Sequence, residues 1–142
     1  MTRRNNFSTK AWLLLGNRNL PGKLRLSSGR LSFCVLGEGN LGRRGFEKLE
    51  ARSGCAELGA LVERGARPLL FELPLSEVER VHFPWYYFSG GLKLTIAGVQ
   101  YRFGFDQPSN SRGVNEGGDL FGSIARARRA GKAWKAVFEE GS

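Results

Sequence analysis

Four basic side chains near the N-terminus are the residues of this sequence best placed to do chemistry. Lys23 and Arg25 alternate with leucines, and Arg30 follows a Ser-Gly turn after them. This alternation places all three cations on the outward face of a predicted β-hairpin, and Arg18 then lies over its edge. Guanidinium groups that converge in this way can hold a phosphate group with paired hydrogen bonds. The same pattern also fits an ordinary solvated strand face, so two interpretations remain open.

The most aromatic segment of the chain is FPWYYF at residues 83–88, which we expect to form a strand. Trp85 and Tyr86 are candidate interface residues, because Trp and Tyr are favoured where a membrane meets water. Aromatic side chains of this kind can also stack on nucleic acid bases. A third interpretation, burial of both faces of the strand in the core, is the one that we favour.

No set of residues has the spacing of an enzyme active site. The segment 37–42 reads GEGNLG, the glycine pattern of dinucleotide sites, but such sites need a parallel β-α-β unit. The neighbouring strands are predicted hairpins, so we interpret the match as chance. One histidine, His82, and two separated cysteines, Cys34 and Cys55, are too few for a zinc site. We therefore expect no enzyme activity, no metal and no cofactor, with two unpaired thiols in a reducing compartment.

The charge of the chain is concentrated in its N-terminal third. The 142 residues carry a net charge of +9, and residues 1–37 contain seven basic side chains and no acidic one. Such a one-signed field suits phosphate groups in lipid or nucleic acid, although many small basic proteins are merely soluble at high pI. No apolar run approaches the roughly 20 residues needed to span a bilayer, and 11–15 is too short for a secretion signal. We expect a cytoplasmic protein, either free or peripheral to the inner face of the membrane.

Period-two alternation between glycine turns predicts an antiparallel sheet. We expect its strands at residues 11–15, 23–27, 30–35, 69–73, 76–82, 83–88, 92–96 and 101–105. Residues 1–10 are expected to form a basic flexible arm, and residues 140–142 a tail. By composition, residues 106–118 form a loop.

Two helices are predicted outside this sheet. Residues 46–64 have helical spacing that Gly54, Gly59 and the following Gly65 weaken, and they belong to an insertion at about 38–67. Residues 119–139 predict an amphipathic helix, with an apolar stripe at Leu120, Ile124, Ala127, Gly131, Trp134 and Phe138. Five cations face away from this stripe, and we interpret them as a solvated face rather than a contact for lipid or nucleic acid: Arg126, Arg128, Arg129, Lys132 and Lys135.

Four segments carry a family resemblance: GKLRLSSGRLSF at 22–33, ELPLSEVERV at 72–81, FSGGLKLTIAGVQYRFGF at 88–105 and AWKAVF at 133–138. Together they resemble the bacterial pleckstrin-homology-like superfamily, in particular its GRAM-like branch, over about residues 20–139. The resemblance implies a mainly β fold with a C-terminal helix, in a single domain at residues 11–139. That fold is an antiparallel barrel of two near-orthogonal sheets, capped by the amphipathic helix.

Many members of this superfamily hold anionic lipid headgroups at the open end of the barrel, and others bind peptides or act as adaptors. The lipid-binding pattern has a basic-x-Arg on the second strand, which Lys23-Leu24-Arg25 matches. Its basic residue near the end of the first strand is missing here, and Arg18 is the nearest cation. We therefore expect a non-enzymatic binding module that associates with anionic headgroups through the basic hairpin. The alternatives are a protein–protein interaction adaptor and charge-driven nucleic-acid binding, and the oligomeric state stays open.

Overall fold

Seven antiparallel strands form one open sheet in the part of the chain that the structure describes, residues 6–84, 90–106 and 120–141. This computed structural model gives the sheet the order β4-β3-β2-β1-β7-β6-β5, with β1 at its centre. The strands are β1 Phe7–Leu15, β2 Arg18–Ser27, β3 Arg30–Val35, β4 Leu69–Pro74, β5 Arg80–His82, β6 Gly91–Ile96 and β7 Val99–Gly104. The two edges are β4 and β5, and no pairing joins them among the described residues, so the sheet does not close.

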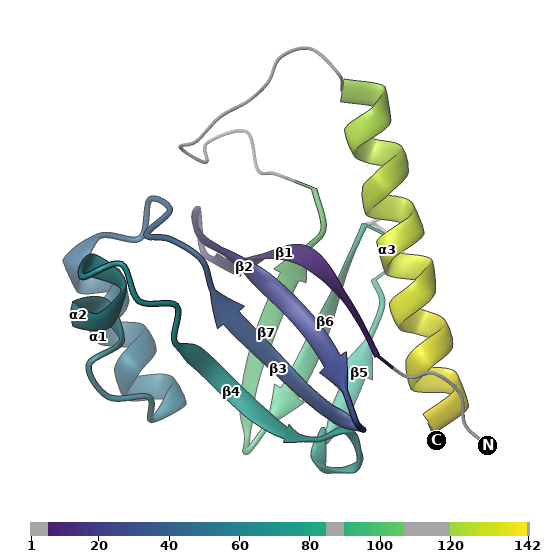
Figure 1. Cartoon of the computed structure of the whole chain (residues 1–142), viewed down its shortest axis with the longest axis horizontal. Coiled ribbons are helices and arrows are strands. Elements are labelled where there is room, and N and C mark those ends of the chain that lie inside the picture. The colour runs from purple at the N-terminus through teal and green to yellow at the C-terminus, as the bar shows by residue number, and fades with distance from the viewer. Residues whose placement is uncertain (1–5, 85–89, 107–119, 142) are drawn as a thin grey trace.

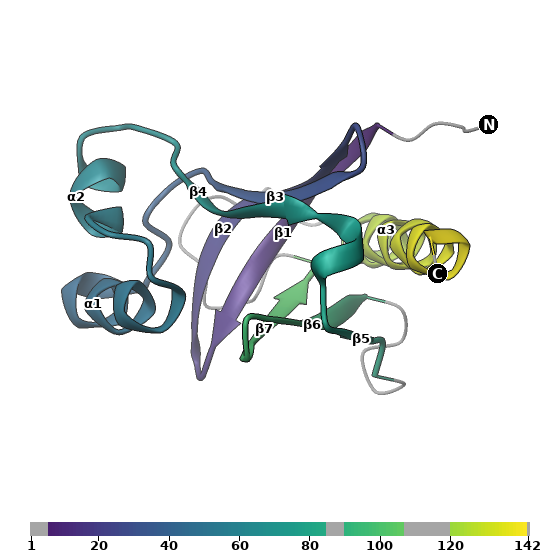
Figure 2. The same ribbon diagram turned by 90° about the horizontal axis from the view of Figure 1, so that it is seen from below.

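Helices lie at both ends of the sheet. The insertion between β3 and β4 contains α1 (Gly42–Ser53) and α2 (Leu58–Glu63), and α3 (Leu120–Gly141) comes after β7. A short 3-10 helix, η1 (Leu75–Glu77), leads from β4 to β5. Figure 1 shows α1 and α2 at one end of the molecule and α3 at the opposite end. Figure 2 shows β1–β4 as a layer over β5–β7, so the sheet folds over its own inner face.

Tight turns connect neighbouring strands because their residues accept the required backbone. Ser28 and Gly29, between β2 and β3, have φ values of 54° and 77°. Ala97 and Gly98, between β6 and β7, have φ values of 51° and 80°. Two consecutive residues with positive φ give the two-residue hairpin turn whose twist matches that of the strands. The hairpins predicted at these two turns are confirmed.

The inner face of the sheet packs against α3 around Trp134. This indole is fully buried, and its Nε1 donates a 2.9 Å hydrogen bond to Thr9 Oγ1 on β1. Its ring centre lies 4.4 Å from that of Phe7, which shares the inner face of β1 with Thr9. Ala127 is also buried, and the five cations predicted to face away from the stripe are exposed. The predicted amphipathic character of α3 is therefore confirmed over residues 124–139.

The first two strands begin earlier than predicted. β1 starts at Phe7 rather than at residue 11, so residues 7–10 belong to the sheet and not to a flexible arm. They join the sheet because Phe7 and Thr9 alternate with polar residues and supply its inner face. In the same way β2 starts at Arg18 and runs without interruption to the turn at residue 28.

The predicted insertion is confirmed, but it contains two helices rather than one over 46–64. α1 begins at Gly42 rather than at residue 46. It ends where Gly54 adopts a φ of 77° and its N–H donates to the carbonyl oxygen of Glu50. This left-handed cap is a conformation that glycine adopts without strain, and it separates α1 from α2.

The region after β4 also differs from the prediction. Residues 76–82 contain η1 and a three-residue β5 instead of one strand. The aromatic segment 83–88 was expected to be a strand, but Phe83 and Pro84 lie outside any strand. Proline has no N–H to give to a neighbouring strand, which favours a break at this point. Residues 85–88 lie outside the described part of the chain.

The coarse fold prediction is confirmed: the protein is mainly β, with a C-terminal helix and a helical insertion. The predicted two sheets are one continuous sheet, because β1 pairs with β7 through residues 12–14 as well as with β2 along its whole length. Strong bending of one sheet around β1 replaces the separation into two.

The hydrogen bond between Trp134 and Thr9 is expected to stabilise the docked helix. T9V leaves a buried indole N–H without its acceptor, which costs about 1–3 kcal/mol of unfolding free energy. Because W134F removes the donor, the double variant T9V/W134F should cost less than the sum of the two single changes. Urea denaturation of the unaltered protein, the two single variants and the double variant measures this coupling. T95V, which changes a half-buried threonine on the outer face of β6, is the control. Additive costs would show that the bond contributes nothing.

Gly22 on β2 has no room for a side chain. A Cβ at this position would overlap the ring of Phe33 and lie 2.5 Å from the carbonyl oxygen of Cys34. We expect G22A to lower the unfolding free energy by about 1–3 kcal/mol, because the core must shift to accept the methyl group. G37A is the control, since its nearest neighbour would be Pro21 Cγ at 3.7 Å. Equal urea midpoints for the two variants would contradict this reading of the core.

Candidate functional site

The outer face of β1–β3 gathers three of the four cations that the sequence singled out. The strand register places Arg25 opposite Ser32 and Arg30 opposite Ser27, on the same face as Lys23. This sharing of one face is as predicted. The register between β1 and β2 adds Lys10, which lies directly opposite Lys23. We call these four residues, Lys10, Lys23, Arg25 and Arg30, the basic face.

Like charges lie next to one another on this face. Side chains directly opposite on antiparallel strands have Cβ atoms about 4.5–5.5 Å apart, and like charges in such a pair destabilise the sheet. Lys10 and Lys23 form such a pair, and both side chains are exposed. Arg25 follows on β2 at the next outward position, about 6.6 Å further along the strand. Three cations therefore share a small area of a rigid surface.

One carboxylate lies among these cations in the described part of the chain. Arg30 Nε lies 3.7 Å from Glu72 Oε2 on β4, and both side chains are about half exposed, at 48% and 47%. An exposed pair of this kind contributes little to stability. Lys10, Lys23 and Arg25 form no ion pair with any described residue. The charge of these three cations is therefore available to a ligand.

Arg18 lies apart from the basic face. Its Nη1 donates to the carbonyl oxygens of Asn40, at 2.8 Å, and Leu41, at 3.5 Å. Along β2 it is five residues from Lys23, which corresponds to about 17 Å of extended strand. The structure thus places Arg18 where it holds the start of the insertion against the sheet. The other two predicted interface residues, Trp85 and Tyr86, lie outside the described residues.

The glycine-rich segment 37–42 packs on β2. Asn40 Oδ1 accepts a 2.8 Å hydrogen bond from the backbone N–H of Asn19. Gly39 has a φ of 58°, and a Cβ there would collide with the carbonyl oxygen of Asn19. The strand before this loop, β3, pairs antiparallel with both of its neighbours, so the parallel unit of a dinucleotide site is not formed here. The glycines serve close packing.

A groove of about 860 Å³ lies between the two insertion helices and the loop before them. Acidic side chains dominate its lining: Glu38, Glu47, Glu50, Glu57 and Glu63. Glu50 Oε2 accepts a 2.8 Å hydrogen bond from the backbone N–H of Gly59, so this carboxylate connects α1 to α2. No group of His, Cys, Asp or Glu among the described residues has the arrangement of a metal site.

Neither thiol forms a disulfide, and the surroundings of Cys55 suppress its reactivity. Cys34 and Cys55 are both free and half-buried. Burial raises the pKa of the Cys55 thiol, and the nearby Glu50 carboxylate raises it further. A raised pKa keeps the thiol protonated at neutral pH and so suppresses its nucleophilicity. Cys55 is therefore a packing residue rather than a reactive one.

Two residues of this region escaped the sequence analysis. Lys10 was assigned to the flexible arm, although the alternation in the segment FSTKA at residues 7–11 was the signal that could have placed it in a strand. Trp12 follows Lys10 at the next outward position of β1 and is half-buried. Its place beside the cations depends on the pairing of β1 with β2, which period-two alternation alone does not specify.

The site has to be interpreted from its own residues. No protein-family model matches the chain, and no curated protein sequence matches it either. Among the helices of the described residues, none is both long enough and apolar enough to cross a membrane.

Alkaline pH is expected to destabilise the fold through two weak acids, the buried Tyr101 and the half-buried Cys55. Burial raises the pKa of Tyr101 as well as that of Cys55. As pH rises, these two groups therefore lose their protons at a lower pH in the unfolded chain than in the folded one. The unfolding free energy is constant below the ordinary thiol pKa of 9.0 and decreases as pH rises above it. Urea denaturation between pH 8 and 11 measures this decline. C55S and Y101F should each flatten the decline. T95V, which removes no titratable group, serves as the control, and identical slopes in all variants would refute this cause.

Proposed function

We propose that this chain is a non-enzymatic module that attaches to anionic membrane surfaces through its basic face. The observation that carries the proposal is the pair of lysines, Lys10 and Lys23, held opposite each other with Arg25 beside them. A sheet surface that places like charges directly opposite each other gives up stability, and an anionic ligand relieves the repulsion. Anionic lipid provides many phosphates in one plane, which matches several cations on one rigid face.

The proposal extends to the type of fold. The strand order, with β1 between β2 and β7, and the position of α3 at one end of the folded sheet support a pleckstrin-homology-like barrel of the GRAM-like branch. The insertion of α1 and α2 at the other end is a departure from the usual barrel. In this view the lipid contact lies on the outside of β1–β3, and the protein works in the cytoplasm at the inner face of the membrane.

A second candidate function is a protein–protein interaction adaptor. β4 is a free edge of the sheet, and its first residue, Leu69, is an exposed large hydrophobic residue at 44%. A partner peptide that adds a strand to this edge would gain main-chain hydrogen bonds and an apolar contact. Such binding would respond little to salt, whereas binding through the basic face weakens steeply as salt rises.

Neutralising the lysine pair is expected to weaken membrane binding strongly. Each cation near an anionic bilayer contributes about 1 kcal/mol, so K10Q/K23Q should lower the affinity for phosphatidylserine vesicles roughly thirtyfold. Co-sedimentation at physiological salt, with and without competing DNA, measures the effect.

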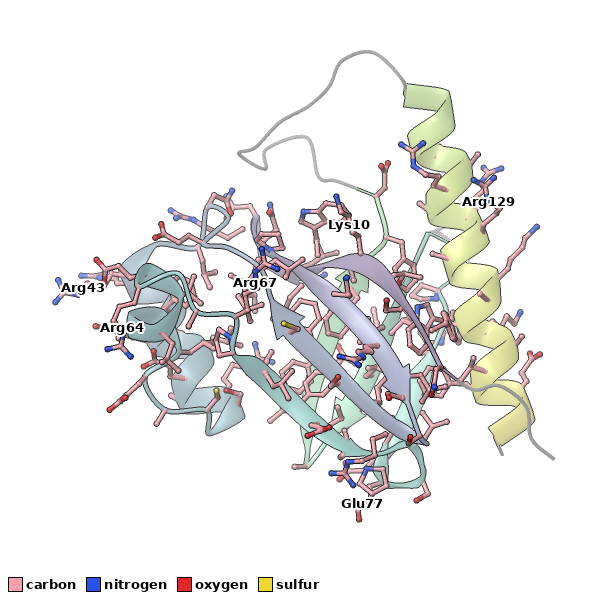
Figure 3. The ribbon with its side chains drawn as sticks, viewed as in Figure 1. Lys10, Arg43, Arg64, Arg67, Glu77 and Arg129 are labelled. Atoms are coloured by element: carbon pink, nitrogen blue, oxygen red, sulfur yellow. The ribbon has the colours of Figure 1, made fainter. Side chains whose placement is uncertain are left out.

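R43Q/R64Q is the matched control, because it removes the same charge from α1 and from the end of α2. Figure 3 shows Arg43 and Arg64 extending from the insertion, at the end of the molecule opposite α3. An equal loss of binding in this control would mean that total charge and not the basic face matters. Failure of the unaltered protein to bind vesicles, or its displacement by DNA, would reject the proposal.

A further inference from the structure

An apolar patch lies next to the basic face on the outside of the sheet. Trp12 lies directly opposite Pro21 on β2, and Leu14 is the next outward residue of β1. All three side chains are half-buried. We call Trp12, Leu14 and Pro21 the Trp12 patch. Ala11 and Leu13 alternate with Trp12 and Leu14 along β1, and their side chains are fully buried in the core. The strand that carries the patch is therefore firmly anchored.

Among the residues that the structure describes, those of β7 leave the patch uncovered. Gly104 is the β7 residue opposite Trp12, and it has no side chain to shield the indole. The Leu14 side chain occupies part of this space, since its Cδ1 would be 3.7 Å from a Cβ on Gly104. An indole beside a glycine on the outer face of a sheet remains available for contact with a partner.

Cations flank the Trp12 patch at one end and along one side. Lys10 precedes Trp12 by one outward position on β1, and Lys23, directly opposite Lys10, follows Pro21 by one outward position on β2. On the β7 side Arg102 lies directly opposite Leu14. The surface therefore has an apolar centre with positive charge at one end and along one side, drawn from three adjacent strands.

This arrangement matches the chemistry of an anionic bilayer surface. Indole side chains favour the level of the lipid headgroups, where one end of the ring contacts apolar groups and the other contacts water. Lysine and arginine extend an aliphatic stem along apolar surface and keep the charge among phosphates. A platform for single-stranded nucleic acid would instead present successive aromatic rings for stacking, and here aliphatic Leu14 and Pro21 adjoin the single indole.

We propose that Trp12 is the residue of this surface that enters the membrane interface, with Lys10, Lys23 and Arg102 in contact with lipid phosphates. The inference rests on the proposed function and adds the requirement that the Trp12 indole enters the bilayer. Charge alone brings the protein to any polyanion, whereas the indole retains it only on a bilayer. Soluble polyanions such as heparin should therefore bind without the help of Trp12.

The test compares the unaltered protein with W12A on vesicles of phosphatidylcholine containing phosphatidylserine, and on heparin. We expect W12A to bind the vesicles about tenfold more weakly, because the buried indole area is lost, and to bind heparin as before. L69A is the matched control, since it removes an exposed apolar side chain from β4. Thermal melting checks that each variant is folded.

A second readout uses brominated lipids, which quench tryptophan fluorescence on contact. It is made in a W85F background, so that Trp12 and Trp134 are the two remaining tryptophans. Trp134 is fully buried, so it should contribute no quenching. W12F keeps an aromatic ring at the cross-strand position and should abolish most of the quenching, which allows a conclusion even if W12A does not fold.

The outcomes separate the two proposals. If the unaltered protein does not bind vesicles, the proposed function fails, and this inference fails with it. If the protein binds but W12A and W12F bind and are quenched as before, only the role of Trp12 is overturned. Loss of oligothymidine binding in W12A with unchanged vesicle binding would also overturn it, in favour of a nucleic acid platform.

Discussion

The indole of Trp134 is buried against the first strand, although 125 residues separate it from its hydrogen-bond partner Thr9. This contact positions α3 on the inner face of β1, the central strand of the sheet. Because side chains alternate along a strand, fixing Phe7 and Thr9 toward the core directs Lys10 and Trp12 to the outside. The candidate binding surface thus depends on packing that occurs entirely on the other side of the same strand.

The insertion is held to the sheet by polar contacts at its start and its middle. Arg18 and Asn19 on β2 bind the backbone and side chain of Asn40, and Gly39 fits where no larger residue would. Further along, Arg52 Nη2 on α1 donates a 3.0 Å hydrogen bond to the carbonyl oxygen of Gln100 on β7. These contacts explain why Arg18, which was predicted to bind phosphate, is engaged elsewhere. Its guanidinium group holds the start of the insertion.

Local rules predicted the parts of this fold that depend on neighbours in sequence. The Ser-Gly turn at 28–29 required positive φ values, and the residues on both sides alternated, so the hairpin and its outward cations followed. The apolar stripe of α3 was equally visible in the spacing of its residues. Errors arose where tertiary contacts decided the outcome. The pairing of residues 7–10 with β2 brought Lys10 into the site, and alternation over so short a segment could indicate a strand but not its partner or register.

The open sheet also has to avoid pairing with further copies of itself. An uncovered strand edge is a template for edge-to-edge aggregation, and natural proteins protect such edges with short strands, prolines and charges. Here β5 has three residues, which is too few for a stable new pairing. β4 ends in Pro74, which offers no N–H, and carries the charged Glu72 in its middle. With a net charge of +9 on every molecule, mutual repulsion adds to this protection, so the uncovered edges are kept from nucleating a fibre.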